Sequence, residues 1–373
     1  MRVTVKCAYS YYPEWRDKSG KNGWKIRRST ENGVRIERHG LYIPRNPNSL
    51  FQRLIYEASF YLSLRRRMPR NGEYDIILVF CPLVGAVAYA AAVRQRLGVP
   101  LWLNVQDLSA QAAAASGIAG KEKNAGVLLR IQNYLFSKAD LWSSISPSMI
   151  ETLERNNPGR IPVRLMPNWL HVSLAGHIRS TRSTQPTGRE TRPLKLLYSG
   201  NIGSKQNLPA LCRELFKTNG DFLLRIQGAG GGTHVLERWI IESGDARFEL
   251  HPLADEKGLA AALSACHFYV ITERKNSGNS FIPSKLIPAL ASETPILAIC
   301  DADSPLGLEM EEFQLGPRID WSNLAGDLTA LFYDSENGER YHFWQNNCRE
   351  RSKYYDRESA IARSFELITE MID

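Results

Sequence analysis

Short apolar runs recur along the chain, and segments long enough for a helix separate them. The runs are DIILVF (75–80), LWLNVQ (101–106), LWSSIS (141–146), PVRLMPN (162–168), LKLLYS (194–199), FLLRIQ (222–227), RFELHPL (247–253), HFYVIT (267–272) and PILAIC (295–300). Near the start, VTVKCA (3–8) alternates as a half-buried strand does. Strands that alternate with helices are typical of parallel sheets covered on both faces. The pattern therefore predicts an α/β fold built from Rossmann-like units.

Chain length and one polar stretch predict the division into domains. A chain of 373 residues exceeds a single hydrophobic core and fits two domains of ordinary size. The stretch HIRSTRSTQPTGRETRP has few apolar residues and many Ser, Thr, Arg and Pro residues, as linkers do. We therefore expect an N-terminal domain at 1–170, a linker at 171–193, a second domain at 194–340 and a final helix at 341–373.

The longest uncharged run, Ile76 to Val93, reaches the length of a membrane-spanning helix. Pro82 divides it into a strand-like half and an alanine-rich half that ends in ArgGlnArgLeuGly. Because proline interrupts a helix, we interpret the run as a buried strand followed by its crossover helix. This interpretation predicts no membrane span.

Composition indicates a soluble globular protein with an anionic partner. Apolar residues make up 43% of the chain and charged residues 23%, and the formal net charge is +8. Such a charge suits nucleic acid, an anionic membrane surface or a phosphorylated substrate. The sequence has no aromatic-basic motif of the RNA-binding type, so we do not expect a nucleic-acid partner.

The cysteines and histidines predict neither a disulfide framework nor a metal site. The six cysteines are scattered without a CxxC pair, as in a cytoplasmic protein whose thiols stay reduced. The seven histidines show none of the spacings that bind metal ions.

The stretch LLYSGNIGSKQNLPAL, from Leu196 to Leu211, joins a predicted strand to a predicted helix that Pro209 opens. In parallel sheets, ligands lie at the carboxyl ends of strands, against helix N-termini. Gly200 and Gly203 can adopt backbone angles closed to other residues and let backbone N–H groups approach a ligand, while Lys205 supplies a positive charge. This arrangement suits a diphosphate. The alternative is a tight turn with a solvent-exposed lysine.

A second glycine cluster, QGAGGGT, follows the next predicted strand and contains Gly228 and Gly230. It begins like the dinucleotide fingerprint GxGxxG, but Thr233 occupies the third position and the cluster lies deep in the second domain. A plain turn between strand and helix is the alternative.

A third segment, FIPSKLIPALASETPILAIC, places Ser284 where it would cap a helix and Lys285 in the first turn. Pro288 complicates this, because a proline beyond the first turn removes a helical hydrogen bond, so the helix would start late. Three strand ends suited to anions in one domain favour a common anion site over three unrelated turns.

These segments resemble a known family. They are similar to motifs of retaining GT-B glycosyltransferases of the bacterial colanic-acid and capsule polysaccharide branch, and they are spread over nearly the whole chain. The motifs are YSGNIGSKQNL, GAGGG, IPSKL, YYPEW, VQDLSAQ, MPNW and CDADS. The resemblance implies two facing Rossmann-like domains, the second of which holds a nucleotide-sugar. It also implies that the last helix returns to the first domain.

The resemblance assigns roles residue by residue. The implied donor-binding residues are Gly200, Asn201, Gly203, Lys205, Gly228, Gly230, Ser284 and Lys285. The implied catalytic residues are Lys205, Gln106 and Asp107, of which the last two would face the reacting sugar or else form a polar strand end. In the family's mechanism the leaving diphosphate helps to accept the acceptor's proton, so the protein positions groups and stabilises negative charge. No cofactor or metal ion is expected.

The chain departs from the family pattern in three places. Ser280 and Pro288 stand where many relatives have two glutamates, and Gln106 stands where the broader family has a histidine. The segment VTVKCAYSYYPEW matches the second strand of close relatives, so we expect an N-terminal domain that lacks its first βα unit. An inactive or truncated nucleotide-binding homologue is therefore an alternative. A metal-dependent GT-A transferase is another, based on Asp301-Ala302-Asp303.

The segment from Ser49 to Arg70 predicts a helix with an apolar stripe and five arginines. The apolar residues are Leu50, Phe51, Leu54, Ile55, Phe60, Tyr61 and Leu64, and the arginines are Arg53, Arg65, Arg66, Arg67 and Arg70. Resembling enzymes often use polyprenol-linked saccharide acceptors in the membrane. We therefore expect the protein to lie peripherally on the inner face of the cell membrane, with Arg65, Arg66 and Arg67 on anionic headgroups. The alternative is an ordinary crossover helix packed on its sheet.

Overall fold

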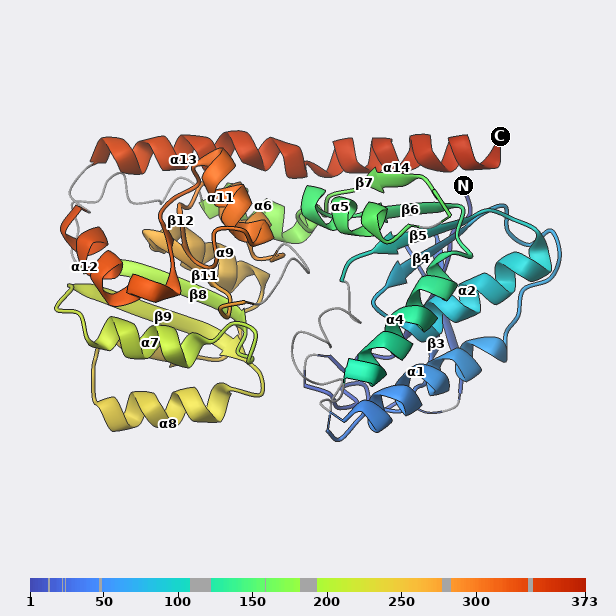
Figure 1. Ribbon diagram of the computed structural model, residues 1–373, viewed down its shortest axis with the longest axis horizontal. Coiled ribbons are helices and arrows are strands. Elements are labelled where there is room, and N and C mark those ends of the chain that lie inside the picture. Colours follow the sequence, from blue (N-terminus) through green and yellow to red (C-terminus); the bar gives the residue numbers. More distant parts are fainter. Residues whose placement is uncertain are drawn as a thin grey trace. The chain divides into compact units, whose positions relative to one another are not determined.

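The chain divides into two compact units in a computed structural model (Figure 1). The structure describes residues 1–12, 14–21, 23, 25–46, 49–107, 122–157, 159–181, 193–276, 283–334 and 338–373. Unit 1 comprises Met1–Met166 together with Arg363–Asp373, and unit 2 comprises Pro167–Ala362. Both are of the α/β class, and each predicted apolar run forms a strand. The predicted fold class is confirmed.

The described part of unit 1 holds two sheets. The first has the order β1 (Thr4–Ala8), β3 (Val34–His39), β2 (Arg27–Glu31), and the second is parallel with the order β4 (Ile77–Cys81), β5 (Leu101–Val105), β6 (Leu141–Ser144), β7 (Val163–Leu165). β2 and β3 form an antiparallel hairpin around Asn32 and Gly33, whose φ angles are 50° and 80°. Positive φ at both central residues is what a two-residue hairpin turn requires.

The helices of unit 1 connect and cover these strands. They are α1 (Leu50–Arg65), α2 (Val84–Leu97), α4 (Glu122–Phe136), α5 (Pro147–Arg155) and the end of α14 (Arg357–Ile372). Tyr56, Phe60 and Leu64 of α1 pack with Tyr89 and Val93 of α2 in one buried cluster. The uncharged run divides into β4 and α2, as predicted, and in the described part of the chain no helix is long and apolar enough to cross a membrane.

The sequence predicted a single apolar stripe on α1, but the structure places two residues of that stripe in the core of unit 1. Phe60 and Leu64 lie in the core of unit 1 and not on the exposed stripe that the sequence predicted. Phe51, Leu54 and Ile55 are exposed, as the stripe requires. The helix is therefore both a packed crossover helix and the carrier of a second apolar face.

The last helix, α14, closes the core of unit 1. Leu367 packs with Trp102, Leu141 and Met166, which lie on or beside β5, β6 and β7, and Ile368 and Met371 line the same cluster. The sequence predicted one helix over 341–373. The structure instead has α13 (Gly338–Ser352), a 3-10 turn η3 (Lys353–Tyr355) and α14. A new helix begins after Asp356, because the Asp356 carboxylate accepts a hydrogen bond of 2.9 Å from the Ser359 backbone N–H and so caps α14.

The described part of unit 2 holds one parallel sheet of six strands. In sheet order these are β10 (Phe248–His251), β9 (Phe222–Ala229), β8 (Leu194–Asn201), β11 (Phe268–Thr272), β12 (Ile296–Ile299) and β13 (Arg318–Ile319). The other elements are α6 (Val172–Thr181), α7 (Leu208–Phe216), α8 (Thr233–Ser243), α9 (Glu256–Ala265), α10 (Leu286–Ala291), α11 (Pro305–Phe313), η2 (Trp321–Asn323), α12 (Leu324–Asp334) and α13.

Alternate residues of β8 face opposite sides of this sheet, because side chains alternate along a strand. Leu196 and Tyr198 enter a core shared with α7, α8 and α12, whereas Leu197 enters a core shared with α6, α9, α10 and α11. Helices thus cover both faces, which leaves the carboxyl ends of the strands as the open edge where a ligand can bind.

The predicted linker at 171–193 differs from the structure. Val172–Thr181 forms α6, whose Leu174 and Ile178 are buried in the core of unit 2. The boundary between the units falls at Met166 and Pro167 instead. The polar composition of the stretch hid this helix, because only two of its residues reach the core. Residues 182–192 of the predicted linker lie outside the described residues.

Candidate functional site

The three strand ends that the sequence singled out are neighbours in unit 2. The sheet order places β9 beside β8 and β8 beside β11, and Gly200 pairs with Gly228 in the β8–β9 register. The loops that follow these strands therefore meet at one edge of the sheet. A backbone hydrogen bond of 2.7 Å from Arg274 N to Lys205 O joins the loop after β11 to the loop after β8.

Glycine is required where the loops after β8 and β9 cross. A Cβ atom at Gly228 would collide with the carbonyl oxygen of Gly200, and one at Gly230 would lie 2.5 Å from Asn201 Oδ1. The Gly200 oxygen is a backbone atom, and a Cβ at Gly230 would also lie 2.5 Å from the backbone oxygen of Ile202, so neither position tolerates a side chain without a shift of the loops. The glycine cluster therefore has a packing reason of its own, independent of any ligand.

The loop after β8 uses its two glycines differently from the prediction. Gly200 has φ 127°, a conformation that favours glycine, as expected. Gly203 has no such angle. Its N–H donates to Gln206 Oε1 at 3.2 Å, and a Cβ there would meet Asn201 Nδ2 and Gln206 Oε1 at 3.0 Å. Crowding by its own loop, and not backbone conformation, explains glycine at position 203.

Lys285 reaches back from the start of α10 to the end of β8. Its Nζ is buried, has no hydrogen-bond partner in the described structure, and lies 3.7 Å from the centre of the Tyr198 ring. Because burial removes water from the ammonium group, the pKa of Lys285 falls to about 7. A Cβ atom at Gly200 would lie 2.7 Å from Lys285 Cε, so the absence of a side chain at Gly200 makes room for the lysine.

A small cavity of about 20 Å³ lies beside Lys285. It is lined by Lys205, Gln206, Ile271, Thr272, Glu273, Pro283 and Lys285. Such a volume holds about one water molecule. The structure thus brings together the two lysines that the sequence selected, from two different strand ends.

The same cavity contains a carboxyl group that the sequence did not indicate. Glu273 directly follows β11 and is buried, and this burial raises its pKa to about 7 although Ser304 and Lys205 act in the opposite direction. Thr272 Oγ1 is buried without a hydrogen-bond partner among the described residues. Glu273 sits at a strand end with no local motif around it, so only the fold reveals its place.

The expectation that Ser284 caps a helix is wrong. Residue Lys285, with α-helical backbone angles and no capping side-chain bond, precedes Leu286, the first residue of α10, and Ser284 is exposed. The helix starts late because Pro288 then falls within the first turn, where its missing N–H breaks no helical hydrogen bond.

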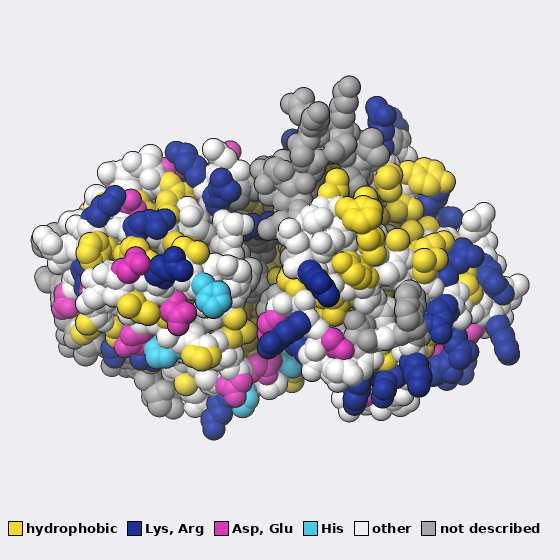
Figure 2. All heavy atoms as spheres, turned by 90° about the horizontal axis from the view of Figure 1, so that it is seen from below, with side chains coloured by type: hydrophobic (Ala, Val, Ile, Leu, Met, Phe, Trp, Pro, Cys, Tyr) yellow, Lys and Arg dark blue, Asp and Glu magenta, His cyan; other side chains and the backbone are white. Residues whose placement is uncertain are grey.

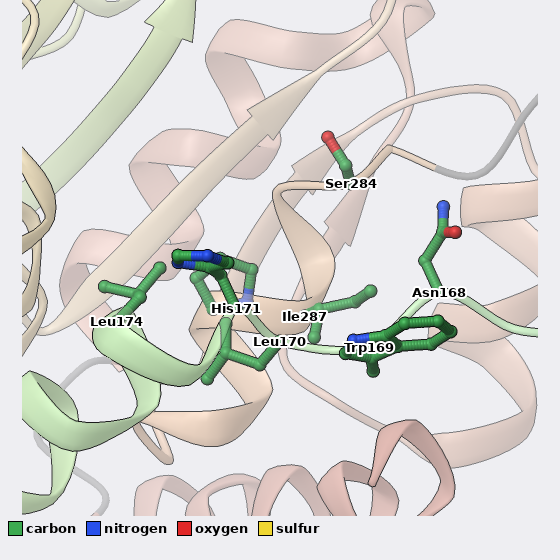
Figure 3. A pocket seen from close by; sticks show the side chains of 8 residues that line it. Asn168, Trp169, Leu170, His171, Leu174, Ser284 and Ile287 are labelled. Carbon is green, nitrogen blue, oxygen red and sulfur yellow. The ribbon is translucent and has the colours of Figure 1, made fainter. Parts of the chain in front are cut away.

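A second and larger pocket lies against the other side of α10 (Figure 3). Its volume is about 320 Å³, and it is lined by Asn168, Trp169, Leu170, His171, Leu174, Ser284, Ile287 and Pro288. Figure 3 shows the Ser284 hydroxyl and the Asn168 amide at one end, the Trp169 ring beside them, and His171 with Leu174 at the other end. The indole of Trp169 is 42% exposed. The sequence missed this pocket because its wall joins the end of the predicted N-terminal domain, the start of the predicted linker and the distant segment around Ser284.

Gln106 and Asp107 follow β5 and belong to unit 1, whereas all predicted donor-binding residues belong to unit 2. The Gln106 side-chain amide donates to Asn104 Oδ1, and its backbone N–H donates to Cys81 O at 3.1 Å. Both residues thus have the polar strand-end position that the sequence gave as their alternative. Their part in catalysis stays a prediction.

The Asp301-Ala302-Asp303 segment forms a turn. Asp301 Oδ2 accepts a hydrogen bond of 2.7 Å from Asn276 N, and the next residue, Ser304, caps α11. Among the described residues, no three His, Cys, Asp or Glu side chains are grouped so that they could hold a metal ion. Ser280, one of the two departures from the glutamate pair, lies outside the described residues, and Pro288 lies in α10.

Comparison with known proteins finds one family match in the N-terminal part of the chain and one similar protein. Residues 2–169 match the family described as "Glycosyl transferase 4-like domain". The colanic acid biosynthesis glycosyl transferase WcaI of Escherichia coli (strain K12) is 26% identical over 320 residues, which cover 83% of this chain and 78% of that protein.

Solved structures share the fold over almost the whole chain. Sucrose-phosphate synthase from Thermosynechococcus elongatus has a TM-score of 0.72 at 16% identity and covers 99% of this chain and 88% of its own. Anabaena HepE in complex with UDP-glucose has a TM-score of 0.62 at 14% identity, with 87% and 84% covered. Starch synthase IV from Arabidopsis thaliana bound to ADP and acarbose has a TM-score of 0.58 at 12% identity, with 93% and 84% covered. The chain therefore has the GT-B fold, carries a glycosyl transferase 4-like domain over residues 2–169, and is a glycosyltransferase.

Proposed function

We propose that this glycosyltransferase moves a sugar, with retention of configuration, from a nucleotide-sugar to a polyprenol-linked saccharide that grows into a cell-surface polysaccharide. One observation carries the donor assignment. Lys205 and Lys285 come from different strand ends and line a single cavity at the carboxyl edge of β8 and β11. The cavity holds only about one water molecule, so we propose that the diphosphate lies at its mouth, where two lysine side chains suit its two charges.

The comparisons support the same donor class. The solved HepE structure contains UDP-glucose, and the starch synthase IV structure contains ADP. The WcaI relative is named for colanic acid biosynthesis, which motivates a polysaccharide acceptor for this chain. The nucleotide and the sugar are not specified by these relatives.

The proposed chemistry needs charge stabilisation more than acid–base residues. The bond from the sugar's anomeric carbon to the diphosphate oxygen breaks, and the diphosphate leaves with the electron pair. The acceptor oxygen bonds to the same face of that carbon, and its proton passes to a diphosphate oxygen. Lys205 and Lys285 stabilise the leaving charge, while Gln106 and Asp107 are proposed to face the reacting sugar from unit 1.

A transfer assay tests this proposal. The protein is incubated with UDP-glucose, ADP-glucose or GDP-mannose and a polyprenol diphosphate-linked sugar in detergent, and the product is analysed by proton NMR. We expect one donor to be consumed and the new bond to keep the donor's anomeric configuration. Inversion would contradict the retaining mechanism, and the absence of any donor binding would contradict the donor site.

The two lysines also lead us to propose that no metal ion takes part, because they can supply the positive charge that a bound cation gives in other transferases. The transfer rate should therefore persist in EDTA. Loss of the rate in EDTA and its return with added Mg²⁺ or Mn²⁺ would favour a metal-dependent mechanism instead.

We further propose that α1 attaches unit 1 to an anionic membrane surface. Phe51 is 71% exposed and Leu62 is 56% exposed, and Leu54 and Ile55 are exposed with them at helical spacing. Arg65, Arg66 and Arg67 are exposed at the C-terminal end of this stripe. Figure 2 shows hydrophobic side chains gathered on one face of the molecule with Lys and Arg side chains beside them. Apolar side chains flanked by arginines are typical of helices that lie in the membrane interface.

A further inference from the structure

The side-chain nitrogen of Lys285 lies in a buried environment that disfavours the charged ammonium form. We propose that Lys285 is an uncharged amine in the free protein and takes up one proton from solvent when the donor's diphosphate enters, so that donor binding is coupled to proton uptake. The inference rests on the proposed donor site and names the protonation step by which that site acquires its charge.

The first step of the argument is the lack of partners. An ammonium group has three donor N–H bonds, yet Lys285 Nζ is buried and makes no hydrogen bond within the described part of the protein. Its close neighbour is the face of the Tyr198 ring, 3.7 Å from Nζ to the ring centre. A ring face attracts a cation only weakly compared with the loss of hydration on burial. The pKa of about 7 follows from this burial.

The second step concerns the walls that hold the side chain. Gly200, with its φ of 127°, leaves open the space that Lys285 Cε occupies, since a Cβ there would lie only 2.7 Å away. Leu286 and Leu290 of α10 are fully buried and anchor the helix that carries the lysine. The amine therefore stays at the wall of the cavity where the diphosphate is proposed to bind.

The third step identifies the other groups that face Lys285 and could exchange a proton. Tyr198 on β8 and Tyr269 on β11 have pKa values raised far above neutral by burial, and the Tyr269 hydroxyl donates to Ser199 O at 3.1 Å. These phenols keep their protons. Lys205, from the loop after β8, lines the same cavity. Glu273, after β11, has a pKa raised to about 7 and is the rival proton acceptor.

Binding of a diphosphate is expected to make the protonated form of Lys285 the favoured one. A nucleotide-sugar diphosphate carries two negative charges throughout the neutral pH range, so it contributes no proton of its own. Its charge gives the ammonium form the partner that the free protein lacks, and the pKa of Lys285 rises in the complex. Below pH 7 the lysine is already charged, and binding takes up little proton. Above pH 7 each bound donor brings a proton, and donor affinity falls about tenfold per pH unit.

Calorimetry on the full chain measures this directly. UDP-glucose, ADP-glucose and GDP-mannose are titrated at pH 8.0 in phosphate and in Tris, whose ionisation enthalpies differ, so that the number of protons taken up follows from the difference in heat. We expect uptake of about 0.9 proton per donor at pH 8.0 and an increase of about tenfold in Kd between pH 7.5 and pH 8.5. Binding with no proton uptake, and with a constant Kd, overturns the inference and leaves the donor site intact.

Three variants assign the proton. Lys285→Met should abolish the uptake, whereas Lys205→Met, which removes the other cation of the cavity, should weaken binding and leave the uptake unchanged. Uptake that survives in Lys285→Met and disappears in Glu273→Gln would place the proton on Glu273 and overturn the assignment. Should Lys285→Met fail to fold by circular dichroism, the heat difference of the unaltered protein still decides. If none of the three nucleotide-sugars binds at pH 6.5, the proposed function itself fails.

Discussion

Gly200 and Lys285 share one space across the edge of the sheet in unit 2: a Cβ at Gly200 would lie 2.7 Å from Lys285 Cε. The two residues are far apart in sequence and come from different loops. The absence of a side chain at Gly200, at the end of β8, therefore leaves free the space that the Lys285 side chain occupies.

The first prediction is that Gly200→Ala weakens both the fold and the donor site. The methyl group displaces Lys285, and the φ of 127° is strained for alanine, so we expect the free energy of unfolding to fall by about 1–3 kcal/mol. Urea unfolding and nucleotide-sugar titration measure the two effects. Gly231→Ala is the matched control in the next loop, because a Cβ there has no atom within 4 Å. Equal donor affinity in Gly200→Ala and the unaltered protein would show that Lys285 does not touch the donor.

The second prediction concerns Lys205. If this lysine binds the diphosphate, Lys205→Ala should weaken donor binding by about 1–3 kcal/mol, the range for losing a hydrogen bond to a charged group. Lys257→Ala, at an exposed position of α9, is the control for a simple change of net charge. An intact fold with unchanged donor affinity in Lys205→Ala would remove Lys205 from the site.

Sequence alone predicted the strands of this protein better than its site. Buried strands such as ILAI of β12 are continuously apolar and can be recognised in the sequence, whereas the β2–β3 hairpin was missed because its strands carry mostly polar residues. Those charges pair across the ladder, as in the 2.7 Å contact of Arg28 Nε with Glu37 Oε1. No periodicity of hydrophobic residues marks such a hairpin.

The site was predicted as a set of residue types and not as an arrangement. Lys205 and Lys285 were selected from local motifs, and the structure brings both to one cavity. The buried position of Lys285 over Tyr198 and the carboxyl group of Glu273 depend on the order β9, β8, β11 in the sheet. The order of strands in a sheet depends on the tertiary fold, so it could not be predicted from the local sequence around each residue.

The third prediction tests the membrane surface on α1. Each arginine beside an anionic surface contributes about 1 kcal/mol, so replacing Arg65, Arg66 and Arg67 with glutamine should release the protein from phosphatidylserine vesicles. Release should occur more readily as salt rises, because salt screens the attraction. Vesicle sedimentation measures both effects.

The matched control for this experiment removes the same charge from exposed positions of unit 2. The three positions are Arg179, Arg238 and Arg357. This control variant should sediment like the unaltered protein. Equal binding of the unaltered protein to vesicles without anionic lipid would reduce the arginine cluster to a solvated helix end.

The fourth prediction is a pH dependence of stability that originates in unit 1. Glu57 of α1 is buried, and its Oε2 accepts a hydrogen bond of 2.8 Å from the Gly85 backbone at the start of α2. Burial raises its pKa to about 7, above the ordinary value of 4.5. A carboxyl group with a raised folded-state pKa stabilises the fold fully at low pH, and that stability is lost as the pH rises through 7.

The Glu57→Gln variant isolates this contribution, since glutamine keeps an acceptor oxygen for Gly85 and cannot ionise. Between pH 6 and pH 8 the unaltered protein should lose about 1 kcal/mol of stability relative to the variant. Urea unfolding midpoints at the two pH values measure the difference. Parallel pH profiles for the two proteins would contradict the raised pKa.

The packing of Leu367 on Trp102, Leu141 and Met166 has a consequence for how the protein is made. A ribosome delivers the chain from the N-terminus, so the strands of unit 1 emerge before any residue of unit 2. The segment that completes their core, Arg363–Asp373, is synthesised only after every residue of unit 2. Until that segment has been made, Trp102 lacks the cover that Leu367 gives it in the folded protein, so unit 1 completes its core only after the chain of unit 2 has been synthesised.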